Sequence, residues 1–206
     1  MKLQNKQLCQ TRQEKIMYAL DKLECMSRSQ LQSLFQLKSV RNANRVLYNM
    51  SSFLNHKRLH ENVYYLSKKG RQHIGSEKNK PHLTQLEHKV RRNDIYLYYG
   101  CPKDWKVERP NEWRIQGETY KLISDARFSL QGVICFVEVD LKQKMLENKK
   151  KIKLYHSLFQ ALGHQQALLI FYTTTPVRKE RILSWCQEYK VNAEILTTED
   201  FENYFL

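Results

Sequence analysis

The sequence predicts an α+β protein built from two domains. Three observations predict this fold class. Cationic side chains are concentrated in the first 80 of the 206 residues. Apolar residues in the first third recur at helical spacing and are followed by a short pattern typical of a β-hairpin. The remainder alternates between helical patterns and apolar runs typical of buried strands, which predicts an α/β arrangement.

The charge is distributed unevenly along the chain. Lysines and arginines number 35 against 21 acids, which gives a formal net charge of +14. Residues 1–80 carry 16 basic and 5 acidic side chains, whereas residues 81–206 carry 19 and 16. Such an asymmetry indicates a polyanionic partner, either nucleic acid or an anionic membrane surface. The alternative is a solvated basic surface that maintains solubility.

Composition excludes several classes of protein. No apolar run approaches the roughly 18 residues that a spanning helix needs, and the first residues lack the apolar stretch of a signal peptide. The five cysteines are scattered and form no C-x-x-C pair, which argues against a disulfide framework and a thiolate zinc site. We therefore expect a cytoplasmic protein without a membrane partner.

The first domain is expected over residues 1–75 and begins with two short helices. Apolar residues recur at helical spacing from residue 16 to residue 23. A capping box, either Ser27 with Gln30 or Ser29 with Gln32, precedes the second helix.

A third helix is expected after Ser39, which is suited to cap it. Its apolar stripe runs from Val40 to Leu54. The opposite face is polar and contains arginine and asparagine, the side chains best suited to pair with guanine and adenine edges. The candidate DNA-binding residues on this face are Arg41, Asn42, Asn44, Arg45, Tyr48 and Asn49.

A β-hairpin is expected over residues 57–66, with a turn at Glu61-Asn62 and with Lys57 and Arg58 at its start. Three helices followed by a hairpin resemble the winged helix-turn-helix family. This resemblance implies that the third helix enters the major groove of double-stranded DNA, and it adds Lys57 and Arg58 to the candidate DNA contacts. The alternative is that the polar face is only solvated.

A tether is expected at residues 76–82, because this polar segment contains no apolar anchor. The preceding residues from Ser67 onward can cap one last short helix. A second domain is then expected over residues 83–206. Its predicted elements are a helix at 83–97 with Glu87 and Asp94 facing inward, strands near 105–109, 113–115, 120–128 and 133–139, a helix at 145–162, a strand at 167–172, a helix at 176–189, a strand at 191–196 and a final turn.

Two acidic motifs lie at the strands of this second domain. Asp125 follows Ser124 before a predicted hairpin, and Glu138 and Asp140 share one face at the end of the central strand, because side chains alternate along a strand. This order resembles the PD-(D/E)xK restriction-endonuclease-like superfamily. The resemblance implies that Asp125 and Glu138 bind a divalent cation such as Mg²⁺, which prefers oxygen ligands.

The lysine of that motif is absent. Asp140 stands in its place and cannot perform its role, although Lys142 would share the same face if the strand continued. The candidate catalytic set is therefore Asp125, Glu138, Asp140 and Lys142. It is consistent with an active site that has relocated its lysine or with a fold that has lost catalysis.

Over its whole length the sequence resembles the replication-relaxation family of plasmids and mobile elements, which joins a winged helix to a domain of this type. The Glu138-Val139-Asp140 triplet and the lysine- and tyrosine-bearing segment 149–155 carry this resemblance. It implies a sequence-preferring, double-stranded-DNA-binding protein in plasmid replication, mobilisation or transcriptional control. The alternative function is a metal-dependent DNA endonuclease that uses Asp125 and Glu138. Candidate protein partners are a replication protein, a relaxase or a second copy of the chain.

Overall fold

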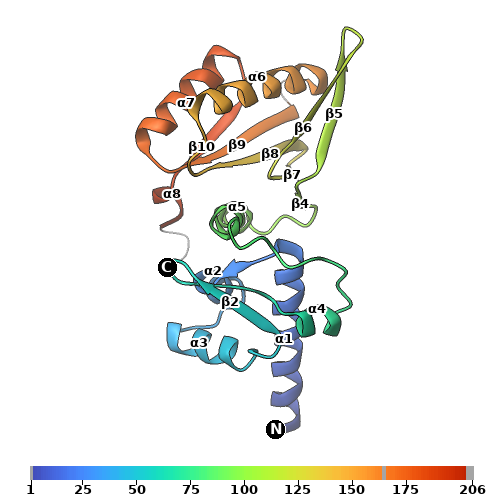
Figure 1. The fold of residues 1–206 in the computed structure, drawn as a ribbon, viewed down its shortest axis with the longest axis vertical. Coiled ribbons are helices and arrows are strands. Elements are labelled where there is room, and N and C mark those ends of the chain that lie inside the picture. Colours follow the sequence, from blue (N-terminus) through green and yellow to red (C-terminus); the bar gives the residue numbers. More distant parts are fainter. Residues whose placement is uncertain (1, 164–165, 203–206) are drawn as a thin grey trace. The chain divides into compact units, whose positions relative to one another are not determined.

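The computed structural model describes residues 2–163 and 166–202, and it is a mixed α+β fold (Figure 1). The chain divides into two compact units, with the division between Leu97 and Tyr98. Each unit is described by itself.

The first unit contains five helices among its described residues and a small antiparallel sheet with the strand order β1-β3-β2. The hairpin pairs residues 54–58 with residues 62–66, and Met26 and Ser27 add a short third strand. The elements are α1 (Lys2–Leu23), β1 (Met26–Ser27), α2 (Arg28–Leu34), α3 (Val40–Tyr48), β2 (Leu54–Arg58), β3 (Asn62–Leu66), α4 (Lys68–His73) and α5 (Leu86–Tyr98).

Serine side chains cap three of these helices. Ser27 forms a complete capping box with Gln30 at the start of α2, which settles the choice between the two predicted boxes. Ser39 accepts a hydrogen bond from the Asn42 amide (3.3 Å), and Ser67 accepts one from the Gly70 amide (3.1 Å). These caps were predictable because each depends on neighbours in sequence.

The third helix is shorter than predicted. It ends at Tyr48 with Asn49 as its C-cap, and Leu54 begins strand β2. Met50 and Leu54 are buried as the apolar pattern requires, but they lie in a turn and a strand. In a short segment, apolar spacing alone does not distinguish a longer helix from a helix followed by a turn and a strand, because a turn can bury the same positions.

Helix α5 packs in the first unit, although it was expected to open the second domain. Its side chains donate hydrogen bonds to backbone carbonyls at the C-terminal end of α1, where Glu24 has a left-handed backbone (φ 70°). Arg92 and Asn93 donate to the Leu23 carbonyl at 3.0 and 3.1 Å, and Asn93 also donates to the Cys25 carbonyl at 2.6 Å. The boundary between the units therefore follows this helix, and residues 76–82 lie inside the first unit.

The second unit is built on a five-stranded sheet with the order β10-β9-β8-β7-β4. Strands β8, β9 and β10 are parallel, and β7 and β4 are antiparallel to their neighbours. The segment predicted as one strand over 120–128 is two strands, separated by Ser124 and Asp125. The elements are β4 (Lys106–Val107), β5 (Pro110–Ile115), β6 (Glu118–Ile123), β7 (Ala126–Leu130), β8 (Val133–Asp140), α6 (Met145–Leu162), β9 (Ala167–Thr173), α7 (Pro176–Glu188), β10 (Ala193–Leu196) and α8 (Glu199–Glu202).

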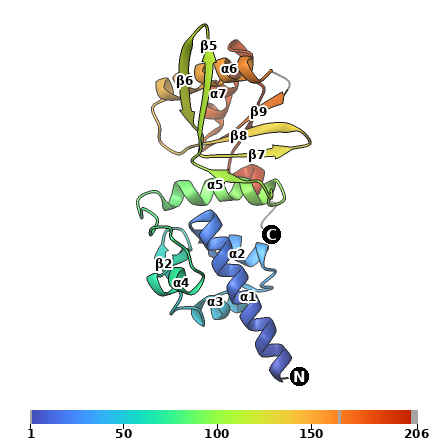
Figure 2. The same cartoon turned by 90° about the vertical axis from the view of Figure 1, so that its right-hand side faces the viewer.

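Helices α6 and α7 cover one face of this sheet, and the separate hairpin of β5 and β6 extends the same core (Figures 1 and 2). Phe136 of β8, Tyr155 of α6 and Trp185 of α7 are buried there together. Trp113 of the hairpin joins them and donates to the Ser157 hydroxyl at 2.9 Å. Residues on β8 that share the face of Phe136 therefore point towards the two helices.

Candidate nucleic-acid interface and acidic cluster

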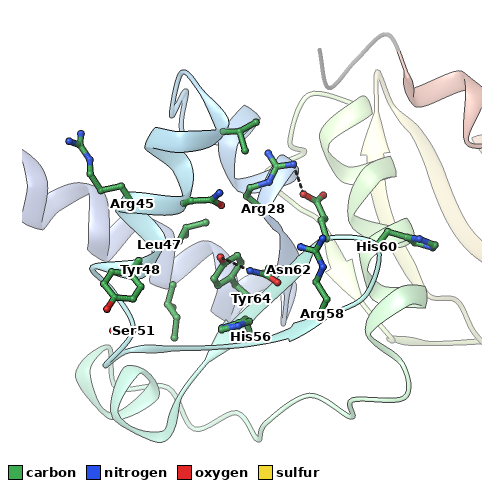
Figure 3. A pocket seen from close by; sticks show the side chains of 14 residues that line it. Arg28, Arg45, Leu47, Tyr48, Ser51, His56, Arg58, His60, Asn62 and Tyr64 are labelled. Carbon is green, nitrogen blue, oxygen red and sulfur yellow. Dashed lines mark hydrogen bonds and ion pairs between the residues drawn. The ribbon is translucent and has the colours of Figure 1, made fainter.

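A groove of about 710 Å³ lies in the first unit between helix α3 and the β2–β3 hairpin. Asn44, Arg45 and Tyr48 line it from α3, and Arg58 lines it from the hairpin (Figure 3). Tyr48 is 78% exposed, which is unusual for a large aromatic side chain. The groove thus presents polar, cationic and aromatic groups to solvent.

The groove remains cationic because its one lining acid is paired. Glu61 forms an ion pair with Arg28 at 2.8 Å, which Figure 3 shows, and it also accepts the Ser29 backbone amide at 3.2 Å. Arg45 and Arg58 are the other cations in the lining, with His56 and His60 beside them. A surface of this composition attracts phosphate groups.

In the second unit, Glu138 and Asp140 of β8 point towards α6 and α7, and each is 1% exposed. Both oxygens of Glu138 accept hydrogen bonds from α6. Oε1 accepts from the Tyr155 hydroxyl at 2.6 Å, and Oε2 accepts from the Lys151 ammonium. A buried carboxylate needs such partners, because its desolvation is costly.

Asp140 is neutralised from the other helix. Its Oδ2 accepts from Arg178 Nε of α7 at 2.9 Å and from Asn148 of α6 at 2.9 Å. Its Oδ1 accepts the Gln143 amide at 2.9 Å. Asp140 therefore links the end of β8 to both helices.

Asp125 lies near Glu138, at the turn before β7. Its Oδ2 accepts the Val139 amide at 2.7 Å, which fixes the carboxylate beside β8. Burial, and after it the Asp125 charge, raise the pKa of Glu138 to about 7. Burial acts to lower the pKa of Lys151, but the Glu138 and Asp125 carboxylates outweigh it and raise that pKa above its usual value.

Comparison with known proteins identifies the family. The family model described as replication-relaxation matches residues 17–170. The chain belongs to the replication-relaxation family. This membership indicates a role in plasmid or mobile-element replication or mobilisation. No curated protein matches the sequence. The chain is also similar to the crystal structure of protein VC1899 from Vibrio cholerae, with a TM-score of 0.43 and 10% identity, over 81% of this chain and 41% of that one.

The groove of this replication-relaxation protein contains four of the eight candidate DNA contacts, namely Asn44, Arg45, Tyr48 and Arg58. The other four are placed differently. Arg41 is exposed on α3 outside the lining, and Asn42 donates to the Leu37 carbonyl (2.8 Å) at the start of the helix. Asn49 is the C-cap, and Lys57 donates to the Leu83 carbonyl at 3.4 Å.

Arg28, His56 and His60 also line the groove, although they were not among the predicted DNA contacts. Arg28 carried a detectable signal, because it stands at the first position of helix α2, where the helix dipole disfavours a cation. In the structure the Arg28 charge is balanced by an ion pair with Glu61, which lies 33 residues later in the sequence. Pairing across that separation depends on the tertiary fold.

The lysine beside Glu138 is Lys151 of α6, whereas Lys142 is an exposed residue after β8. The inward acids predicted on the helix at 83–97 belong to the first unit, where Asp94 accepts from Gln30 at 2.7 Å and Glu87 is exposed. The residues present do not fit the expected Mg²⁺ site, because both Glu138 oxygens accept from Tyr155 and Lys151. Within residues 2–163 and 166–202, no group of three or more metal-binding side chains is brought together.

None of the described helices of this family member is both long enough and apolar enough to cross a membrane.

Proposed function

We propose that this protein binds double-stranded DNA with sequence preference through its first unit. In this proposal the unit acts as a winged helix-turn-helix domain, with α3 as the recognition helix and the β2–β3 hairpin as the wing. The observation that carries the proposal is the cationic groove between these two elements, whose only lining acid is paired with Arg28.

The chemistry of the groove suits both backbone and base contacts. Arg45 and Asn44 are exposed on α3, and these residue types form bidentate pairs with guanine and adenine edges in the major groove. Arg58 is exposed on the hairpin, where a cation suits the adjacent phosphate backbone. Because the residues suited to base contacts lie on α3 and a cation suited to phosphate lies on the hairpin, we propose that α3 selects the DNA sequence and that the hairpin adds affinity.

Family membership gives this binding its context. We propose that the DNA target lies in a plasmid or mobile element and that the second unit supports assembly with a replication protein, a relaxase or a second copy of the chain. The nuclease alternative is not favoured, because Tyr155 and Lys151 occupy both oxygens of Glu138.

The test has two stages. The purified protein first selects the plasmid fragments that it binds, which identifies a preferred site. The affinity of the protein for that site and for random DNA is then measured by titration. Arg45→Ala is expected to cost about 1–3 kcal/mol on the preferred site and much less on random DNA. Arg41→Ala removes the same charge from the same helix, but outside the groove. It should weaken binding to the preferred site and to random DNA by similar amounts, and by less than Arg45→Ala weakens binding to the preferred site.

The matched control is Arg114→Ala, which removes an exposed arginine from strand β5 of the second unit. It should leave both affinities unchanged. Equal losses from Arg45→Ala on the two DNAs would reduce Arg45 to a phosphate contact. Equal losses from Arg45→Ala and Arg114→Ala would contradict the assignment of binding to the groove.

A further inference from the structure

Strand β8 ends in two buried carboxylates, and each is paired with a cation from a different helix. Lys151 of α6 pairs with Glu138, and Arg178 of α7 pairs with Asp140. The arrangement places one positive charge beside each buried negative charge. It removes the need for an external counterion at either position.

The position beside Glu138 is the one where a divalent cation was expected. A hard cation needs carboxylate oxygens that are open to it. Here one Glu138 oxygen accepts from Tyr155 at 2.6 Å and the other from Lys151, while an Asp125 oxygen accepts the Val139 amide at 2.7 Å. The Lys151 charge also acts on Asp125. The ammonium thus lies within the field of both carboxylates.

We infer that the Lys151 ammonium takes the place of a divalent cation between Asp125 and Glu138, so that the second unit is complete without a metal. The side chain reaches this position from one turn of α6, since Lys151 and Tyr155 are four residues apart and therefore lie on the same face. The inference does not depend on the DNA-binding proposal, because it concerns only residues of the second unit.

A dissolved ion can reach Lys151 and Asp125, so the exchange of the ammonium for a metal can be tested. The Lys151 side chain is 27% exposed, and Asp125 is partly exposed, so that solvent reaches this edge of the cluster. Removing the ammonium takes away the positive charge that pairs with Glu138 and also acts on Asp125. A dissolved metal ion can then supply the missing charge.

The experiment uses the chain of 206 residues and Mn²⁺ alone as the probe. Thermal unfolding in EDTA and in MnCl₂, and electron paramagnetic resonance of free Mn²⁺, are compared for the wild type, Lys151→Met and the control Lys150→Met. Lys150 is a neighbouring lysine of α6 whose side chain is 71% exposed and pairs with Glu147.

The wild type and Lys150→Met should melt at the same temperature with and without Mn²⁺ and should show no saturable site that depends on Glu138. Lys151→Met should melt lower in EDTA, gain one saturable Mn²⁺ site and recover about 4 °C or more when Mn²⁺ saturates it. Adding Asp125→Asn to Lys151→Met should abolish that gain.

Two results overturn the inference. One is saturable Mn²⁺ binding by the wild type that Glu138→Gln removes. The other is a folded Lys151→Met protein that binds no Mn²⁺. If Lys151→Met does not fold in EDTA, the comparison of the wild type with Glu138→Gln decides alone, with binding by the wild type refuting the inference and its absence supporting it.

Discussion

At the scale of single residues, Gln30 shows how one buried polar side chain joins distant parts of the first unit. Its Oε1 accepts the Ser27 amide at 2.9 Å, and its Nε2 donates to the Val90 carbonyl at 2.8 Å and to Asp94 at 2.7 Å. The capping half of this role was predictable from Ser27 and Gln30, which are three residues apart. The contacts with α5 were not, because they join residues that are 60 and 64 positions apart in the sequence.

Replacing Gln30 should cost more than the loss of a helix cap. Gln30→Ala leaves the Ser27 amide, the Val90 carbonyl and Asp94 without this partner in a buried region, and each unsatisfied group costs about 1–3 kcal/mol. Ser27→Ala should cost about 1 kcal/mol as a cap. Gln187→Ala, at an exposed position of α7, is the matched control and should lie within about 0.5 kcal/mol of the wild type. Denaturant unfolding measures all three, and a Gln30→Ala cost no larger than that of Ser27→Ala would refute the bridging role.

Asp94 should make the stability of the first unit depend on pH. Burial is the largest cause that raises the pKa of this carboxyl from its ordinary 3.8 to about 6. The folded state therefore binds the proton more tightly than the unfolded state, and the free energy of unfolding falls as pH rises from about 4 to about 6. Asp94→Asn keeps an oxygen for Gln30 and removes the buried charge.

Relative to the wild type, Asp94→Asn should gain stability as pH rises through this window, by up to about 3 kcal/mol for a difference of about two pKa units. Denaturant unfolding at pH 4, 5, 6 and 7 gives the comparison. The Arg91 guanidinium, 3.2 Å from this carboxyl, attracts only the ionised form, and its effect is already contained in the raised pKa of Asp94. A difference between the two proteins that stays constant from pH 4 to pH 7 would show that Asp94 does not titrate there.

At the scale of elements, local signals predicted which segments are helices and strands better than where they end. The hairpin of the first unit was expected, but it begins at Leu54 because the chain turns directly after Asn49. The partners of Glu138 and Asp140 were not predicted. Lys151 and Arg178 reach these acids only because α6 and α7 pack on the same face of the sheet, and packing of that kind leaves no signal in local spacing.

Helix α4 passes close to the backbone that precedes the hairpin, and Gly70 makes this approach possible. A Cβ atom at Gly70 would lie 2.2 Å from the Phe53 carbonyl oxygen. In an ordinary helix a change from glycine to alanine adds up to about 1 kcal/mol of stability. Here Gly70→Ala should instead destabilise the unit by about 1–3 kcal/mol, because the backbone must shift.

Lys69→Ala is the control for that substitution, since Lys69 is an exposed neighbour in the same helix. It should change stability by less than about 0.5 kcal/mol. Thermal unfolding distinguishes the two variants. A melting temperature for Gly70→Ala at or above that of the wild type would mean that α4 is free to move away from Phe53.

At the scale of the whole chain, the charge asymmetry predicted that the two parts differ, and the structure divides the chain into two units. The position of the boundary was not predictable from composition. Residues 76–82 are polar and lack an apolar anchor, which is typical of a linker. Several of the residues that attach α5 to the first unit are polar, among them Lys89, Arg92 and Asn93. Polar residues on a helix normally indicate its solvated face.

The extent of the first unit can be tested with fragments. Residues 1–97 include α5, whereas residues 1–82 match the expected first domain and its tether. Loss of α5 removes the donors to the Leu23 and Cys25 carbonyls and the two cations paired with Glu24, Lys89 at 2.5 Å and Arg92 at 3.0 Å. It also removes Leu86, which is buried with Val63 of the hairpin. The shorter fragment therefore loses buried polar partners and apolar burial together.

Residues 1–97 should unfold cooperatively and bind duplex DNA with an affinity that falls steeply with salt, because most of the excess positive charge lies in this part of the chain. Residues 1–82 should show little cooperative unfolding and weaker binding. The groove is formed by α3 and the hairpin, and the contacts of α5 with the rest of the unit help to hold these elements in place. Circular dichroism during heating and DNA titration at two salt concentrations provide the comparison. If residues 1–82 melt at the same temperature as residues 1–97 and bind as tightly, α5 is dispensable and the first unit ends at the polar segment.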